Sequence, residues 1–334
     1  MTITILIMIA SALLIYFSCE LFVNGIEWVG KAFNISQSAV GSVLAAFGTA
    51  LPESIVTFIA VVFGVNASQK DIGVGAALGG PLVLSTIGYA AIGICIIIFS
   101  GRRKIGSCIN VNVKKLERDQ IWFMFIFVFK VGLGLVAFAI KPWLGFLFIL
   151  AYAFYFYREM REDTIEVTGE LEPLKFSPQN THPKKSFILI QTIISLIFIF
   201  IGSQVFVHNL ETLSISLGMS PHLVALLLSP IATELPEILN VFIWVKQGKE
   251  NLAIANISGS MMIQATIPSA LGIIFTPWIL DRSLILSAIV TFIAIIVILI
   301  TLKISCLSAK KLSLNSILYV IFIIGFLIIR GSVF

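Results

Sequence analysis

Two six-residue motifs carry a proline and then a carboxylate in the middle of apolar runs long enough to span a bilayer. The first occupies residues 48–53 and reads GTALPE, and the second occupies residues 232–237 and reads ATELPE. A proline inside a helix leaves one backbone carbonyl without its N–H donor, and a carboxylate at that depth is costly and by default functional. The pairing predicts one site within the membrane, where two interrupted helices meet.

The chemistry expected of this site is cation binding. An ionised carboxylate in hydrocarbon takes up a proton unless a positive charge stabilises it, and neither motif contains Lys or Arg. Carboxylate, hydroxyl and carbonyl oxygens are the ligands that Ca2+ takes in proteins. Glu53 and Glu237 are the central candidates, Thr49 and Thr233 supply hydroxyls one helical turn earlier, and Glu234 adds a third carboxylate on the helix face of Glu237.

The third apolar run of each half is expected to complete the site. In the second half, Asn256, Ser260 and Gln264 place amide and hydroxyl oxygens at helical spacing, and Gly259 allows close helix approach. The corresponding stretch of the first half, residues 75–81, reads GAALGGP and is nearly stripped of polar side chains. The sequence therefore predicts a lopsided site.

The composition excludes a soluble globular protein. Of the 334 residues, 58% are hydrophobic and 12% are charged, and the mean hydropathy is +1.05. A globule of this size has too little interior to bury that much apolar surface. The apolar runs are also longer and less alternating than barrel strands, so the chain is predicted to be an all-α polytopic membrane protein.

Ten apolar runs, separated by polar or Gly/Pro breaks, are the expected transmembrane helices, since one span takes about 20 apolar residues. The first five run over 3–31, 36–65, 71–99, 119–140 and 142–158, and the second five over 186–214, 220–246, 250–276, 282–302 and 312–330. The first run lacks the basic start and the cleavage pattern of a signal peptide. It is therefore expected to remain as the first span.

The two halves of the chain are predicted to be an internal duplication, because the motif at 48–53 aligns with the motif at 232–237 in an ungapped register. Five spans per half is an odd number, so the second half enters the membrane from the opposite side, as in transporters with inverted repeats. The predicted organisation is a five-helix repeat over residues 1–160, a cytoplasmic linker over 161–185 and a second, inverted five-helix repeat over 186–334.

Basic residues in the connections give the expected orientation. If ten spans alternate, one face carries 17 Lys and Arg, and the opposite face carries only Lys70, Lys141, Arg282 and Arg330. Loops rich in Lys and Arg stay in the cytoplasm, so both termini are predicted to lie outside. The formal charge of +5 comes from these loops and does not indicate nucleic-acid binding.

The double motif, with a Gly-Gly or Gly-Ser stretch after its two copies, resembles the two repeats of the Ca2+/cation antiporter superfamily, and the sodium/calcium exchanger branch is the most similar. The resemblance implies ten helices in two inverted repeats and exchange of Ca2+ for Na+, K+ or H+. It also implies that Glu53 and Glu237 are the central Ca2+ ligands and that Thr49 and Thr233 line neighbouring Na+ positions.

The third apolar run of each half, over 71–99 and 250–276, matches the family pattern in part. The Ser of that pattern falls on Ser260 and its Asn or Asp falls on Gln264, but the first-repeat Ser becomes Gly80. The Ser that follows each motif Thr is replaced by Ala50 and Glu234. Oxygen ligands expected for sodium are thus missing while a carboxylate is added. A proton on one of three crowded carboxylates is therefore a candidate coupling ion beside Na+.

The sequence thus predicts a secondary active antiporter that moves a divalent cation, foremost Ca2+, in exchange for Na+ or H+ by alternating access. The alternatives are a cation channel or passive pore lined by the same acids, and an antiporter for Mn2+ or Mg2+. Neither enzyme activity nor a cofactor is expected. The predicted partners are inorganic cations and the lipid bilayer, without nucleic acid, and the predicted location is the cell membrane.

Two further features of the sequence carry no functional prediction. Lys130 lies in the middle of the fourth apolar run, where it could snorkel to the interface or face the helix bundle. The four cysteines, which are Cys19, Cys95, Cys108 and Cys306, show neither a disulfide pattern nor metal-type spacing.

Overall fold

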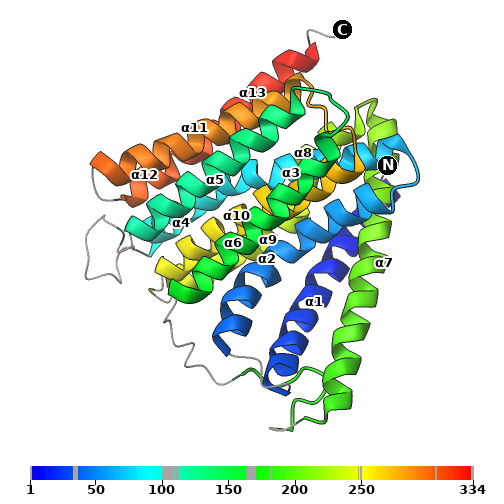
Figure 1. Cartoon of the computed structure of the whole chain (residues 1–334), viewed down its shortest axis with the longest axis vertical. Helices are drawn as coiled ribbons and strands as arrows, with labels where there is room; N and C mark the ends of the chain where they lie inside the picture. Colours follow the sequence, from blue (N-terminus) through cyan, green and yellow to red (C-terminus); the bar gives the residue numbers. More distant parts are fainter. Residues whose placement is uncertain are drawn as a thin grey trace.

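The protein is a bundle of helices (Figure 1). The computed structural model describes residues 2–32, 37–99, 109, 113–162, 171–180, 183–246, 248, 250–304 and 307–331. In the first half the elements are α1 (Thr2–Ala32), α2 (Gln37–Val62), α3 (Ala67–Val83), the π turn η1 (Leu84–Gly88), α4 (Tyr89–Ile98), α5 (Val113–Gly134), the 3-10 turn η3 (Lys141–Leu144) and α6 (Gly145–Glu162). In the second half they are α7 (Lys185–Leu217), α8 (Pro221–Thr233), α9 (Leu235–Lys246), α10 (Glu250–Phe275), α11 (Arg282–Ile304), α12 (Ala309–Ser313) and α13 (Asn315–Gly331).

Several helices have the length and hydropathy of membrane spans. Within the described residues, six are long and apolar enough to cross a bilayer, or up to seven if the bent pair α8 and α9 forms one span. Large apolar side chains are exposed along α1, α7 and α13, as expected of surfaces that face lipid. The chain is therefore an integral multi-pass membrane protein, and the number of ten spans remains a prediction.

The helices fall into a central group and a peripheral pair. α1 and α7 lie side by side and run at a steep angle to the remaining helices (Figure 1). Only 28% of the most apolar part of α1 is buried, against 83% for α10. α10 therefore lies in the middle of the bundle, and α1 and α7 lie at its edge.

Two buried apolar clusters reflect this division. One joins α1, α2 and α7 and includes Ile15, Ile59 and Phe206. The other joins the central helices and includes Phe127 and Trp278. α8 contributes to both clusters, so the helix that ends in the second motif packs against the peripheral pair and the central group alike.

The two motifs differ in their effect on the helix. α2 continues through Pro52 without interruption, so the prediction of two interrupted helices is wrong for the first motif. α8 ends at Thr233, and α9 begins at Leu235 after a bend of 41°. The second motif is preceded by a further proline, Pro230. Pro230 and Pro236 lie six residues apart, and each removes one hydrogen bond of the helical backbone. α2 contains a single proline, Pro52.

Glycines on α3 allow it to pack tightly against α8. A Cβ atom at Gly75 would overlap the backbone of His222, and one at Gly79 would lie 2.6 Å from both the Leu226 carbonyl and the Pro230 ring. Pro230 has no N–H, so the Leu226 carbonyl lacks its helical donor. This Gly-x-x-x-Gly spacing is typical of helix pairs whose backbones approach closely, and it holds α3 beside the second motif.

The helix of the fourth predicted span begins and ends about six residues earlier than the sequence predicts. The structure places α5 over Val113–Gly134 rather than over 119–140. The Gly134 carbonyl accepts a hydrogen bond from the Leu280 backbone N–H at 3.0 Å, and α5 ends there. The connection that contains Leu280 also holds Trp278 at a φ of +48°, which is the left-handed region and is rare for a bulky side chain.

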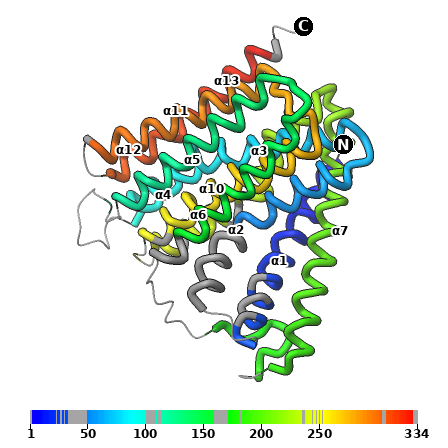
Figure 2. The backbone as a smooth tube through the Cα atoms, viewed as in Figure 1, coloured from blue at the N-terminus to red at the C-terminus, as the bar shows by residue number. Residues whose placement is uncertain are grey.

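Part of the predicted linker is packed against the helices. Residues 171–180 lie at the lower ends of α1 and α7 (Figure 2). The Trp28 indole donates to the Glu172 carbonyl at 3.0 Å, and the Asn24 amide oxygen accepts from the Lys175 backbone and from the Gln191 amide, both at 3.0 Å. This segment therefore fastens α1 to α7.

Candidate cation site

Three carboxylates meet in the interior of the bundle. Glu53 lies on α2, Glu234 occupies the break between α8 and α9, and Glu237 lies in the first turn of α9. All three are 0% exposed. Because buried carboxylates are rare unless they are paired or bind a metal, three of them together make this position the candidate site.

Glu53 is held by hydroxyl groups from the other half of the chain. The Thr233 hydroxyl lies 2.5 Å from its Oε2 atom, and the Ser229 hydroxyl lies 3.4 Å from the same atom. Ser229 and Thr233 are one turn apart on α8, so they share a helix face. The first motif thus meets the second directly through its side chains.

Glu234 is oriented by α10. The Gln264 amide donates to its Oε1 atom at 2.8 Å. A Cβ atom at Gly80 of α3 would lie 2.7 Å from the Gln264 Oε1 atom and 3.1 Å from the Glu234 Oε1 atom. The missing side chain at Gly80 therefore makes room for the Gln264–Glu234 pair, and α3 contributes space where α10 contributes a ligand.

The remaining predicted residues lie on α10 and α2. Ser260 donates to the Glu237 Oε1 atom at 3.4 Å, and Asn256 is buried one turn before Ser260 on the same helix. The Thr49 side chain lies outside the described residues, and so do Cys108 and Cys306. The structure therefore brings together six of the eight predicted site residues on α2, α8, α9 and α10: Glu53, Thr233, Glu234, Glu237, Ser260 and Gln264.

The electrostatics of the cluster favour a cation. The charges of Glu237 and Glu53 both act on Glu234, so the three carboxylates repel one another. Three buried oxygens of Glu53, Glu234 and Gln264 have no hydrogen-bond partner among the residues that the structure describes, namely Glu53 Oε1, Glu234 Oε2 and Gln264 Oε1. Buried acceptors without donors are costly. A cation would satisfy them and relieve the repulsion.

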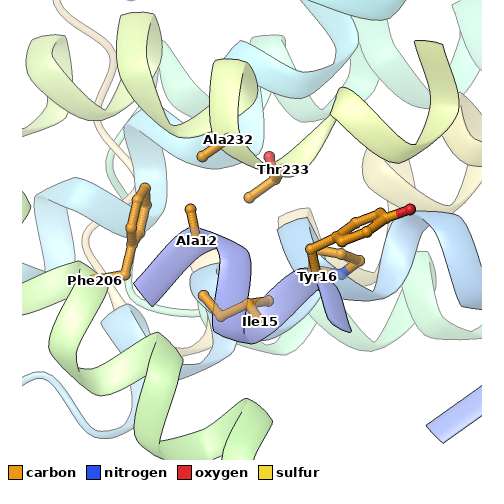
Figure 3. A pocket seen from close by; sticks show the side chains of 7 residues that line it. Ala12, Ile15, Tyr16, Phe206, Ala232 and Thr233 are labelled. Carbon is orange, nitrogen blue, oxygen red and sulfur yellow. The ribbon is translucent and has the colours of Figure 1, made fainter. Parts of the chain in front are cut away.

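α1 covers the cluster from the side of the peripheral pair. Thr233 and Ala232 face Ala12, Ile15 and Tyr16 of α1 across a small pocket (Figure 3). Pro52 and Phe206 complete its lining, and the space is too narrow for a water molecule. Access to Thr233 from this side therefore requires α1 to move.

Among the residues around the carboxylates, the sequence provides no prediction for Ser229, and it assigns no role in the site to Gly80 or Lys130. Ser229 could have been found, because it precedes Thr233 by four residues. Gly80 was noted only as a lost ligand, whereas the structure shows that its lack of a side chain accommodates Gln264. Lys130 faces the bundle and is 0% exposed; its direction depends on packing that a single sequence does not show.

Comparisons with known proteins agree with the motifs. The family model described as sodium/calcium exchanger protein matches residues 3–160 and 187–331. The chain is 25% identical over 288 residues to the inner membrane protein YrbG of Escherichia coli strain K12, which covers 82% of this chain and 81% of that protein.

Solved structures show the same fold. The crystal structure of the H+/Ca2+ exchanger CAX superposes with a TM-score of 0.74 at 18% identity, over 97% of this chain and 82% of that one. The sodium-calcium exchanger NCX_Mj superposes with a TM-score of 0.60 at 20% identity, over 96% and 98%. The chain belongs to the sodium/calcium exchanger protein family, whose members are transmembrane antiporters and not enzymes.

Proposed function

We propose that this protein is a secondary active antiporter that binds one divalent cation, foremost Ca2+, between Glu53, Glu234 and Glu237 and exchanges it for Na+ or H+. The observation that carries the proposal is the set of three fully buried carboxylates. Two of their oxygens, Glu53 Oε1 and Glu234 Oε2, have no hydrogen-bond donor among the described residues. Hard divalent cations take carboxylate, amide and hydroxyl oxygens. Thr233, Ser260 and Gln264 supply the last two types within the same cluster.

Relatives of known activity support this choice of substrate. The two solved structures cited above are described as an H+/Ca2+ exchanger and as a sodium-calcium exchanger. Both share the fold with this chain, at 18% and 20% identity. The extra carboxylate Glu234 supports a mechanism in which a proton or a sodium ion binds to the cluster after the divalent cation has left.

The helix order supports two inverted five-helix repeats with ten spans. α1 and α7 have 31 and 33 residues, and each precedes the helix that carries a motif. α6 ends at Glu162 and α7 begins at Lys185. The proposed repeats are therefore residues 1–160 and 186–334, joined by a linker over 161–185.

Alternating access is proposed to come from the peripheral pair. α1 and α7 are fastened together by residues 171–180 and lie over the cluster. Sliding of this pair across the central helices would open the cluster to one side of the membrane and then to the other, as rigid-body motion of one bundle against another does in inverted-repeat transporters.

The proposed orientation in the cell membrane places both termini outside and the linker in the cytoplasm. The excess of basic residues in the connections on the linker side supports it. A cysteine introduced at Glu172, which is exposed, should react with a membrane-permeant thiol reagent and not with an impermeant one in intact cells. Equal labelling by both reagents would show that the linker lies outside the cell, which contradicts the proposed orientation.

Flux measurements separate the antiporter from a passive pore. Purified protein in liposomes should take up radioactive Ca2+ against its gradient when Na+ or H+ is released in the opposite direction, and the rate should saturate with Ca2+. Cold Ca2+ inside the vesicles should accelerate uptake by counter-transport. Uptake that stays proportional to the Ca2+ concentration and dissipates any imposed gradient would identify a channel instead.

A further inference from the structure

Lys130 is a fully buried cation that contacts α3 and α10, two helices that pack around the carboxylate cluster. It lies on α5 and is 0% exposed. Its ammonium nitrogen contacts α3 at Ala77, about one turn before Gly80, and α10 at Ser269, more than one turn after Gln264. An ionisable group at this depth is costly and marks a functional position. The proposed exchange mechanism does not use it.

The surroundings of the ammonium group are those of a bound monovalent cation. The nitrogen lies 3.0 Å from the Ala77 carbonyl oxygen, 3.1 Å from the Ser269 hydroxyl oxygen and 4.9 Å from the centre of the Phe127 ring. Carbonyl and hydroxyl oxygens accept from the ammonium, and the face of an aromatic ring attracts cations. The pocket is therefore built for positive charge.

Prolines in the two facing helices make these oxygens available. Pro81 follows Ala77 by four residues, so the Ala77 carbonyl has no helical donor. Pro268 follows Gln264 by four residues in the same way, and the Ser269 hydroxyl donates to the Gln264 carbonyl at 3.2 Å. Lys130 thus binds one freed carbonyl directly and the other through Ser269.

Lys130 is also linked to the carboxylates. Its charge and that of Glu53 attract each other. Through Ser269 it contacts Gln264, whose side chain holds Glu234. Three carboxylates and one ammonium leave a net charge of minus two when all are ionised. One divalent cation, or two monovalent cations, neutralises that charge.

We propose that the Lys130 ammonium is a tethered coupling cation, which permanently fills a monovalent position beside the carboxylates and limits exchange to two monovalent ions per divalent ion. This inference rests on the proposed antiport function and adds its stoichiometry. Without Lys130, the carboxylates would carry a charge of minus three, and a third monovalent cation would compete with the divalent cation. A lysine that only caps the two carbonyls would leave the number of coupling ions unchanged.

The test is the dependence of Ca2+ affinity on the competing monovalent cation. Ca2+ binding to the purified full chain is titrated over a series of Na+ concentrations and, separately, of pH. By linkage, an increase of about tenfold in the competing ion should weaken Ca2+ binding about 100-fold in the wild type and about 1,000-fold in Lys130→Met, which removes the charge and ends one heavy atom earlier, so that the position of the ammonium group becomes free.

Ser269→Ala is the matched control, because it removes one contact of the ammonium group and keeps its charge. It should retain the wild-type slope. A folded Lys130→Met protein with the wild-type slope would overturn the proposal. If that variant does not fold, the wild type still decides: a dependence of about 1,000-fold in the wild type would show that Lys130 fills no coupling position. A wild type that binds no Ca2+ would instead overturn the antiport function.

Discussion

Glu53→Gln is expected to abolish divalent exchange and to leave the fold intact. The substitution removes one negative charge from the cluster and keeps the volume of the side chain, so the Thr233 and Ser229 hydroxyls still meet an oxygen acceptor. Loss of a group that only supports a metal ligand costs about 10-fold to 100-fold in affinity. Loss of the ligand itself should reduce Ca2+ uptake into proteoliposomes by more than about 100-fold.

The control for this prediction is Glu172→Gln, which makes the same chemical change on an exposed side chain of the linker. Uptake by that variant should equal the wild-type rate. Thermal unfolding of both variants should begin near the wild-type temperature in the absence of Ca2+. Wild-type flux in the Glu53→Gln protein would show that the Glu53 carboxylate is not needed in the transport site.

Gly75→Ala is expected to have the largest effect on stability. A methyl group at this position would overlap the backbone carbonyl of His222, and backbone cannot move aside as the end of a flexible side chain can. α3 and α8 would have to separate, which would also displace Ser229 and Thr233 from Glu53. Overpacking of this kind costs about 3 kcal/mol or more, and the loss should appear as a lower unfolding temperature in detergent and a low yield of monodisperse protein.

Gly132→Ala on α5 is the matched substitution, because a Cβ atom there would meet nothing within 4 Å. It should leave the unfolding temperature unchanged or raise it slightly, since alanine favours the helix by about 1 kcal/mol over glycine. If Gly75→Ala were as stable as Gly132→Ala, the close contact between α3 and α8 would not exist.

Much of the site could be predicted from the sequence because it depends on local patterns. Hydropathy locates the helices, and two matched motifs point to Glu53 and Glu237 as partners. Helical spacing then adds Glu234, Ser260 and Gln264. The structure places these five residues in one buried cluster, and their role as cation ligands remains the proposal to be tested. The family assignment, which the motifs predicted, is confirmed by the match over both halves of the chain.

The rest depends on packing between elements far apart in the sequence. Pro52 stays inside a continuous helix, although the same residue type accompanies a break in the second motif. Lys130 faces inward because Ala77 and Ser269, which lie 53 and 139 positions away, offer oxygens to it. Residues 171–180 belong to the predicted linker, and they bind Asn24 and Trp28. No local pattern in one sequence encodes such contacts.

Isothermal titration of Ca2+ into the purified protein tests the central claim most directly, because it measures the ion and its carboxylates without any transport step. The account predicts that one Ca2+ binds per wild-type chain, that Glu53→Gln and Glu237→Gln abolish binding, and that Glu172→Gln binds as the wild type does. Absence of Ca2+ binding by the wild type, or unchanged binding by both site variants, would contradict it.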